Sequence, residues 1–186
     1  TVAVGYQAGN DTQGTLSVAI GAQAGATLQG TAAISIGYQS GSVNQSSNTV
    51  ALGNSAGNTN QGDSSVAIGI NEGGMFQDIN SIAIGNAADQ NSQGSGAIAV
   101  GINAGNNTQG IDAVAIGNSA GTNLQGTSSI AIGVNAAYDS QSSTSISIGV
   151  EAGYSSQGIQ SIAMGYQAGY TSQGSNALAI GTQSGN

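Results

Sequence analysis

The sequence predicts an all-β protein that folds as a β-solenoid (a parallel β-roll or β-helix) of about twelve 16-residue coils. The first observation is a glycine that recurs twelve times at a constant spacing of 16, at residues 5, 21, 37, 53, 69, 85, 101, 117, 133, 149, 165 and 181. The second is an apolar triplet before each glycine, as in Ile82-Ala83-Ile84. The third is a glutamine that follows each glycine after eight residues. A fixed period of this length is typical of repeat architectures in which each repeat is one structural unit.

The apolar triplet predicts a β-strand in every repeat. When the recurrent glycine is numbered position 5 of the repeat, positions 2 and 4 are always Val, Ile, Leu or Met, and position 3 is always Ala or Ser. Alternation of period two is typical of a strand, in which successive side chains point to opposite faces. One short apolar triplet in sixteen residues cannot form the apolar stripe of an amphipathic helix.

Further glycines at positions 9 and 14 predict corners, so one repeat is expected to hold two short strands and two corners. Stacked coils place equal repeat positions about 4.8 Å apart along the axis of the solenoid. We expect positions 2 and 4 to point into the coil as two aliphatic ladders. Positions 1 and 3 are then expected to point outward.

The outward strip formed by positions 1 and 3 is a candidate association face. It holds only Ala, Ser and Thr, and its central alanines are Ala67, Ala83, Ala99, Ala115 and Ala131. A long weakly polar strip is unusual on a monomer. Two interpretations compete: a trimer face, or a flat Ala/Ser/Thr face that orders water, as in an ice-binding β-solenoid.

The glutamine at position 13 is present in all eleven repeats that reach this position. Stacked side-chain amides can donate and accept hydrogen bonds along the axis, as in the amide ladders of cross-β structures. We interpret it as a structural ladder, with direct ligand binding as the alternative. Its central members are Gln61, Gln77, Gln93, Gln109 and Gln125.

Three tyrosines occupy position 10 of successive repeats: Tyr138, Tyr154 and Tyr170. Equal positions on successive coils predict that the rings stack along one face. Tyrosine also combines an apolar body with a polar tip, as surfaces that bind sugars or proteins require. The three residues are therefore a candidate surface or ligand contact.

The composition argues against several classes of function. The chain has no Lys, Arg, His or Cys and a formal net charge of −8, so it lacks the groups that bind nucleic acid. No segment is apolar enough for direct membrane insertion. No base is present to activate a serine or threonine nucleophile, and we expect no catalytic residue, no cofactor, no metal site and no enzyme activity.

The eight carboxylates lie at different repeat positions and are expected to be solvated turn residues. Two pairs on adjacent coils could approach one another, Asp63 with Asp78 and Glu72 with Asp89. An acid and base pair of the glycosidase kind is the alternative interpretation there.

The unit Asn80-Ser81-Ile82-Ala83-Ile84-Gly85, followed by Ala88, is similar to the head repeat of YadA-like trimeric autotransporter adhesins. Related repeats occur in phage and virus fibre proteins. The resemblance implies a left-handed parallel β-roll, a homotrimer, and an extracellular place on an outer-membrane-anchored cell surface or a virion fibre. It also implies attachment to a host-surface protein or glycan. We expect residues 1–186 to be a single repeat domain within a longer fibrous protein, with ice binding as the alternative function.

Overall fold

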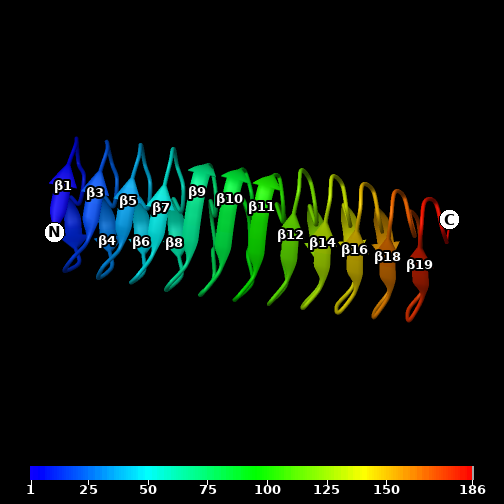
Figure 1. The fold of residues 1–186 in the computed structure, drawn as a ribbon. Coiled ribbons are helices and arrows are strands. Elements are labelled where there is room, and N and C mark those ends of the chain that lie inside the picture. The colour runs from blue at the N-terminus through cyan, green and yellow to red at the C-terminus, as the bar shows by residue number, and fades with distance from the viewer. Residues whose placement is uncertain (186) are drawn as a thin grey trace.

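The computed structural model describes residues 1–185 as a single rod of stacked coils, in which the chain advances by one coil per repeat (Figure 1). All its named elements are short β-strands, and they pair in parallel between successive repeats. The prediction of an all-β parallel solenoid with a 16-residue repeat is confirmed.

The first side of the rod is one continuous sheet of twelve parallel strands. Every pair in it joins equal repeat positions, so that Ala83 lies between Ala67 and Ala99. The strands, in their order across the sheet, are β1 (Val2–Val4), β3 (Val18–Ile20), β5 (Ile34–Ile36), β7 (Val50–Leu52), β9 (Val66–Ile70), β10 (Ile82–Asn86), β11 (Ile98–Ile102), β12 (Val114–Ile116), β14 (Ile130–Ile132), β16 (Ile146–Ile148), β18 (Ile162–Met164) and β19 (Leu178–Ile180).

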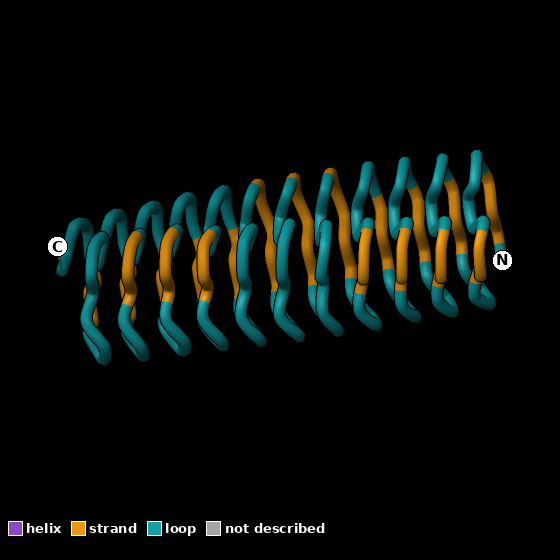
Figure 2. The backbone as a smooth tube through the Cα atoms, turned by 180° about the vertical axis from the view of Figure 1, so that it is seen from behind, coloured by secondary structure: helices purple, strands orange, loops and turns teal. Residues whose placement is uncertain are grey.

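The second side, seen from behind in Figure 2, is divided into two smaller sheets. The first comprises β2 (Asp11–Gln13), β4 (Thr27–Gln29), β6 (Val43–Gln45) and β8 (Thr59–Gln61), and the second comprises β13 (Asn123–Gln125), β15 (Asp139–Gln141) and β17 (Ser155–Gln157). Between them, isolated bridges through the glutamines at 61, 77, 93, 109 and 125 continue the stack. The second side is therefore least regular in the middle of the rod.

The side chains that face the inside of the coil differ from those expected from the sequence. Position 3 is buried from the second coil to the last, as Ala83 and Ser147 illustrate, each with no exposed surface, whereas Ala3 in the first coil is exposed. The side chains at positions 2 and 4 lie on the outer face, where Ile116 and Met164 are each 39% exposed. The expectation that the aliphatic ladders point inward is wrong: alanine, serine, glycine and glutamine fill the coil.

The reason is the small width of a 16-residue coil. A Cβ atom built on Gly105, at position 9, would lie 3.3 Å from the Cβ of Ala99 across the interior. Contact at that distance leaves no room for a branched side chain on either residue. The strand alternation is kept, but the small residues face inward because only they fit.

Tight corners complete each coil. Gly85, at position 5, has φ +150°, and a Cβ atom there would lie 2.4 Å from the carbonyl oxygen of Gly101 on the next coil. Non-glycine residues also adopt positive φ at positions 7, 12 and 16, as Asn71, Asn60 and Asn80 do. The coil thus has more corners than the two that the sequence predicts. At position 5 the backbones of neighbouring coils approach so closely that only glycine fits.

Candidate functional site

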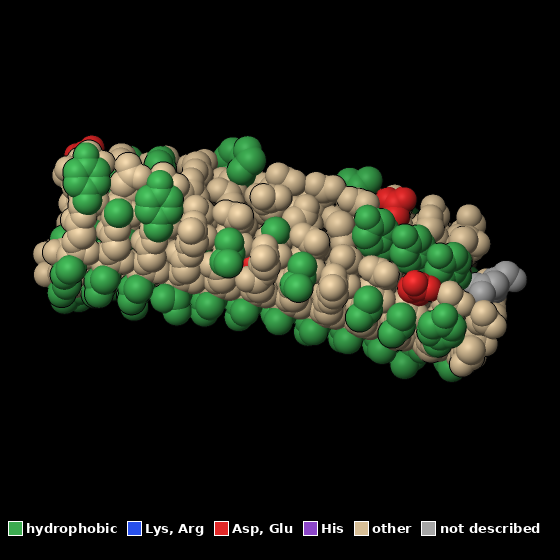
Figure 3. Space-filling model, turned by 90° about the horizontal axis from the view of Figure 1, so that it is seen from above, with side chains coloured by type: hydrophobic (Ala, Val, Ile, Leu, Met, Phe, Trp, Pro, Cys, Tyr) green, Lys and Arg blue, Asp and Glu red, His purple; other side chains and the backbone are tan. Residues whose placement is uncertain are grey.

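Three features stand out from the regular coil: an outward aliphatic face, a tyrosine stack and an irregular central segment. The irregular central segment comprises residues 72–89. The aliphatic face runs along the outside of the twelve-stranded sheet, where Figure 3 shows hydrophobic side chains in a continuous row. Its members are half-buried to exposed; Ile20 and Leu52, for example, are 38% and 40% exposed. This face is a continuous row of aliphatic side chains along the rod.

The alanines predicted for the trimer face are Ala67, Ala83, Ala99, Ala115 and Ala131. Each has no exposed surface, because each lies at position 3 inside the coil. They cannot contact a partner, and the same burial removes the flat small-residue face on which the ice-binding alternative depended.

The position 13 glutamines form a buried hydrogen-bonded ladder. Gln93 Nε2 donates to Gln109 Oε1 at 3.1 Å, and Gln109 Nε2 donates to Gln125 Oε1 at 3.1 Å. Each amide also reaches across its own coil: Gln109 Nε2 donates to the backbone carbonyl of Ile98 at 2.7 Å. Each side chain therefore joins the two sides of a coil and links it to the next.

The ladder is interrupted at three places within the described chain: between Gln13 and Gln29, between Gln29 and Gln45, and between Gln61 and Gln77. Gln61 Nε2 donates only to the backbone carbonyls of Val50 and Ser65, and the Oε1 atom of Gln77 has no hydrogen-bond partner. Gln29 Oε1 also lacks one, close to Ser35, which replaces alanine at position 3. The break at Gln77 coincides with the irregular central segment.

The tyrosine stack lies on the second side near the C-terminal end. The rings of Tyr138 and Tyr154 are 5.2 Å apart and inclined by 6°, and those of Tyr154 and Tyr170 are 5.0 Å apart and inclined by 12°. Both faces of the Tyr154 ring are thus covered by its neighbours. A sugar ring cannot stack on it, and a ligand at this ring would meet its edge and hydroxyl group.

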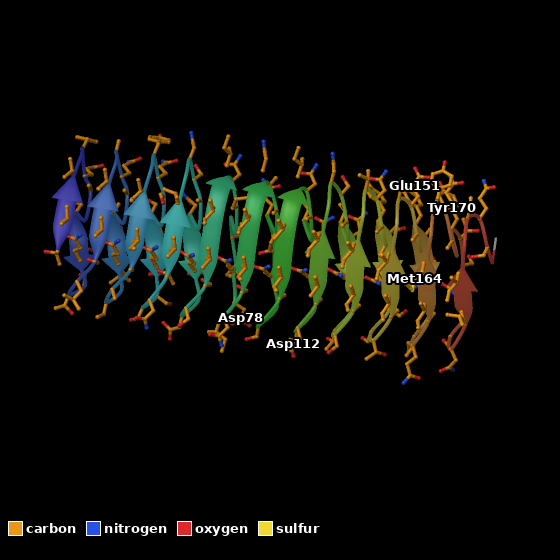
Figure 4. The ribbon with its side chains drawn as sticks, viewed as in Figure 1. Asp78, Asp112, Glu151, Met164 and Tyr170 are labelled. Atoms are coloured by element: carbon orange, nitrogen blue, oxygen red, sulfur yellow. The ribbon has the colours of Figure 1, made fainter. Side chains whose placement is uncertain are left out.

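Acidic groups lie close to the stack. Partial burial, followed by the neighbouring tyrosines and the charges of Glu151 and Asp139, raises the pKa of Tyr154. The Glu151 carboxylate accepts a hydrogen bond from Gln167 Nε2 at 2.8 Å. Figure 4 shows Glu151 and Tyr170 at one edge of the rod, opposite the edge that carries Asp78 and Asp112.

The irregular segment contains two acids inside the coil. Glu72 is fully buried at position 8, and Asp89 is 1% exposed at position 9 of the next coil. All four of their carboxyl oxygens lack a hydrogen-bond partner. The expectation that these two residues are solvated turn residues is wrong, because their positions point into the coil.

Burial raises the pKa of both groups. Loss of hydration raises the pKa of Glu72 from 4.5 to about 8, although the backbone amide of Ala88 opposes the rise. Loss of hydration, followed by the charge of Glu72, raises the pKa of Asp89 from 3.8 to about 8. The charge of Glu72, on the preceding coil, thus adds to the effect of burial on Asp89.

Two depressions open beside this segment. One, of about 440 Å³, is lined by residues that include Asn71, Gly74, Met75 and Gln90. The other, of about 350 Å³, includes Phe76 and Gln77 in its lining. Met75 and Phe76 are 52% and 57% exposed, so an apolar projection separates the two hollows.

The other acidic pair has turn contacts. Asp63 Oδ1 accepts a hydrogen bond from the backbone amide of Ser47 at 2.9 Å, and Asp78 Oδ1 accepts one from that of Ile79 at 2.7 Å. Both are on turns, as expected for solvated residues. Within residues 1–185, no three or more Asp, Glu, His or Cys side chains gather as a metal cluster.

These features define a structural repeat protein: a parallel β-solenoid with an aliphatic outer face and a polar interior. The YadA head domain repeat matches it twice, at residues 13–40 and 109–136. These two matches confirm the sequence resemblance to YadA-like head repeats. Such repeats indicate an adhesin-type surface function and a structural role. No match was found among curated proteins.

In residues 1–185 we find no helix with the length and apolar character needed to cross a membrane.

Proposed function

We propose that this chain is the head or fibre segment of an extracellular attachment protein, and that it acts as a homotrimer on a cell or virion surface. The observation that carries the proposal is the outward aliphatic face. Val, Ile, Leu and Met side chains follow one another along the whole twelve-stranded sheet, and the row continues without a charged residue.

A continuous apolar surface of this length favours association, because covering it removes hydrocarbon from water at about 25 cal/mol per Å². Each coil contributes two aliphatic side chains at the same two positions, so a second rod aligned coil by coil would meet an equivalent row. Identical chains usually associate through closed symmetry. The YadA-like resemblance supplies three as the number of chains.

Light scattering after size-exclusion chromatography tests the trimer. The unmodified chain is expected to give three times its 17.8 kDa mass. The variant V100E/I116E places charges on the aliphatic face, where burying an unpaired charge is strongly unfavourable. We expect it to dissociate into folded monomers.

The matched control is T108E/L124E, which adds the same charges to the same two coils on the opposite side. Leu124 is 59% exposed there. This control is expected to remain trimeric. A folded monomer in the unmodified chain would exclude the trimer, and equal dissociation of both variants would exclude the aliphatic face as its interface.

Attachment itself would use the surfaces that a trimer leaves open. The stack of Tyr138, Tyr154 and Tyr170 lies on the second side, away from the aliphatic face, and presents ring edges and hydroxyl groups beside Glu151 and Asp139. We assign it the contact with a host-surface protein or glycan. Binding to arrays of glycans and matrix proteins, compared between the unmodified chain and Y138S/Y154S, tests this assignment.

A further inference from the structure

The interior of the repeat shows how unusual its two buried acids are. Position 8 is alanine or serine in every repeat except that of Glu72, and position 9 is glycine or alanine in every repeat except that of Asp89. The other coils close with small residues at these positions. The fold therefore does not require a carboxyl group at either place.

A buried carboxylate is unfavourable unless it is hydrogen-bonded or paired with a cation. No donor meets the geometry of a hydrogen bond to any of the four carboxyl oxygens of Glu72 and Asp89, and the backbone amide of Ala88 only partly offsets the cost of burying Glu72. The chain has no Lys, Arg or His, so none of its side chains can supply the opposite charge. Compensation has to come from outside the chain.

A third unpartnered group lies at the same level of the rod. The Oε1 atom of Gln77 is buried without a donor, although the corresponding atoms of Gln93 and Gln109 each accept from the preceding glutamine. A Cβ atom on Gly73 would lie 2.9 Å from Gln77 Oε1, and Asp89 occupies the position of Gly73 on the next coil. The amide oxygen thus lies beside Gly73, the residue that follows Glu72 on the same coil.

A surface hollow lies beside the segment that carries the two acids. Asn71, Gly74 and Gln90 line the 440 Å³ depression, and they are the sequence neighbours of Glu72, Gly73 and Asp89. A Cβ atom on Gly74 would lie 3.1 Å from the carbonyl oxygen of Gln90 and 3.7 Å from that of Asn71. Two backbone carbonyl oxygens, from residues next in sequence to Glu72 and Asp89, therefore lie beside Gly74 at this hollow.

We propose that Glu72, Asp89 and Gln77 form an interior binding site for one hard divalent cation, of which Ca²⁺ is the probe. Two carboxylates balance the charge of such an ion, and the five unpartnered oxygens are all ligands of the type that hard cations select. Backbone carbonyls and water from the hollow would complete the six to eight oxygens that Ca²⁺ takes. The ion would join two coils where the second side has only isolated bridges.

Calorimetric titration of the chelator-treated chain with CaCl₂, together with thermal unfolding at increasing Ca²⁺, tests the site. We expect saturable binding of one Ca²⁺ per chain and a melting temperature that rises with Ca²⁺, since a ligand that binds only the folded state stabilises it. The variant E72A/D89G restores the residues that other repeats carry. It is expected to fold, to lose the binding and to melt independently of Ca²⁺.

Two further variants separate the site from other effects. E72Q/D89N keeps the size of both side chains and removes their charge, and it should also lose the binding. D63N/D78N removes two acids on turns and should bind as the unmodified chain does.

Three results would overturn the proposal. The first is an unmodified chain that binds no Ca²⁺ and melts unchanged in its presence, which would leave protons as the compensating charge. The second is an equal response of E72A/D89G and the unmodified chain to Ca²⁺, which would place the effect elsewhere. The third is loss of binding in D63N/D78N alone.

Discussion

The Nε2 atom of Gln93 donates to the backbone carbonyl of Ile82, 2.8 Å away, and so connects the two sides of one coil through its interior. The same amide donates to Gln109 Oε1 on the next coil at 3.1 Å. One polar side chain per repeat thus fixes both the width of the coil and its stacking. In a rod whose interior holds mainly alanine, serine and glycine, these amides take the place of a hydrophobic core.

The ladder predicts a large loss of stability when one amide is removed. Gln109→Ala deletes the bonds to Ile98 and Gln125, removes one acceptor of the Gln93 amide and leaves Gln125 Oε1 without its donor. Each buried unsatisfied polar group costs about 1 to 3 kcal/mol. We expect a clear fall in the free energy of unfolding by urea, while Gln160→Ala, at an exposed glutamine, should change it by less than about 0.5 kcal/mol. Equal stability of both variants would refute the structural role of the ladder.

The corner glycines predict a position-dependent response to alanine. Gly85→Ala would place a Cβ atom 2.4 Å from the Gly101 carbonyl oxygen at φ +150°, which forces the two coils apart. Gly174→Ala meets nothing within 4 Å. We expect Gly85→Ala to lower the melting temperature sharply and Gly174→Ala to leave it nearly unchanged, as circular dichroism can measure. Similar melting of the two variants would contradict the close stacking.

The buried acids predict that stability falls with rising pH in the presence of a chelator. Their pKa values are about 8 in the folded chain against 4.5 for Glu72 and 3.8 for Asp89 when hydrated. The folded state therefore binds more protons than the unfolded state between about pH 4 and pH 8. The free energy of unfolding consequently falls as the pH rises through that window. Both groups contribute to this slope in the same direction.

Thermal unfolding over this pH window measures the effect. The charge of Glu72 raises the pKa of Asp89. On the coils before and after Glu72, the same repeat position holds Ala56 and Ala88, which do not titrate. The variant E72A/D89G should show a flatter dependence. An equally steep profile in that variant would assign the effect to other carboxyl groups.

The tyrosine stack predicts a local contribution to stability. Tyr154→Ala removes two ring contacts, at 5.2 and 5.0 Å, each worth about 0.5 to 1.5 kcal/mol beyond its buried area. Tyr6→Ala, at a ring that is 73% exposed, is the control and should change little. Chemical denaturation of both variants measures the difference. A Tyr154 variant as stable as the control would show that the stack serves only as a contact surface.

Much of the architecture follows from the sequence alone. The 16-residue spacing of Gly85 and its equivalents sets the coil length, and the alternation around Ala83 sets the strand and the equal register of neighbouring coils. A repeat also predicts that Gln93 stacks on Gln109, because equal positions must superimpose. These properties depend only on the length of the repeat and on the alternation of residue types, and both can be read directly from the sequence.

The tertiary structure decided which face of each strand is inside. Alternation places Ile84 opposite Ala83 without saying which of them points inward, and the usual preference for buried aliphatic side chains gives the wrong answer here. It also decided that Glu72 and Asp89 lie in the interior. The physical reason is the width of the coil: with the Cβ position of Gly105 3.3 Å from Ala99, only small side chains and one extended glutamine fit between the two sides.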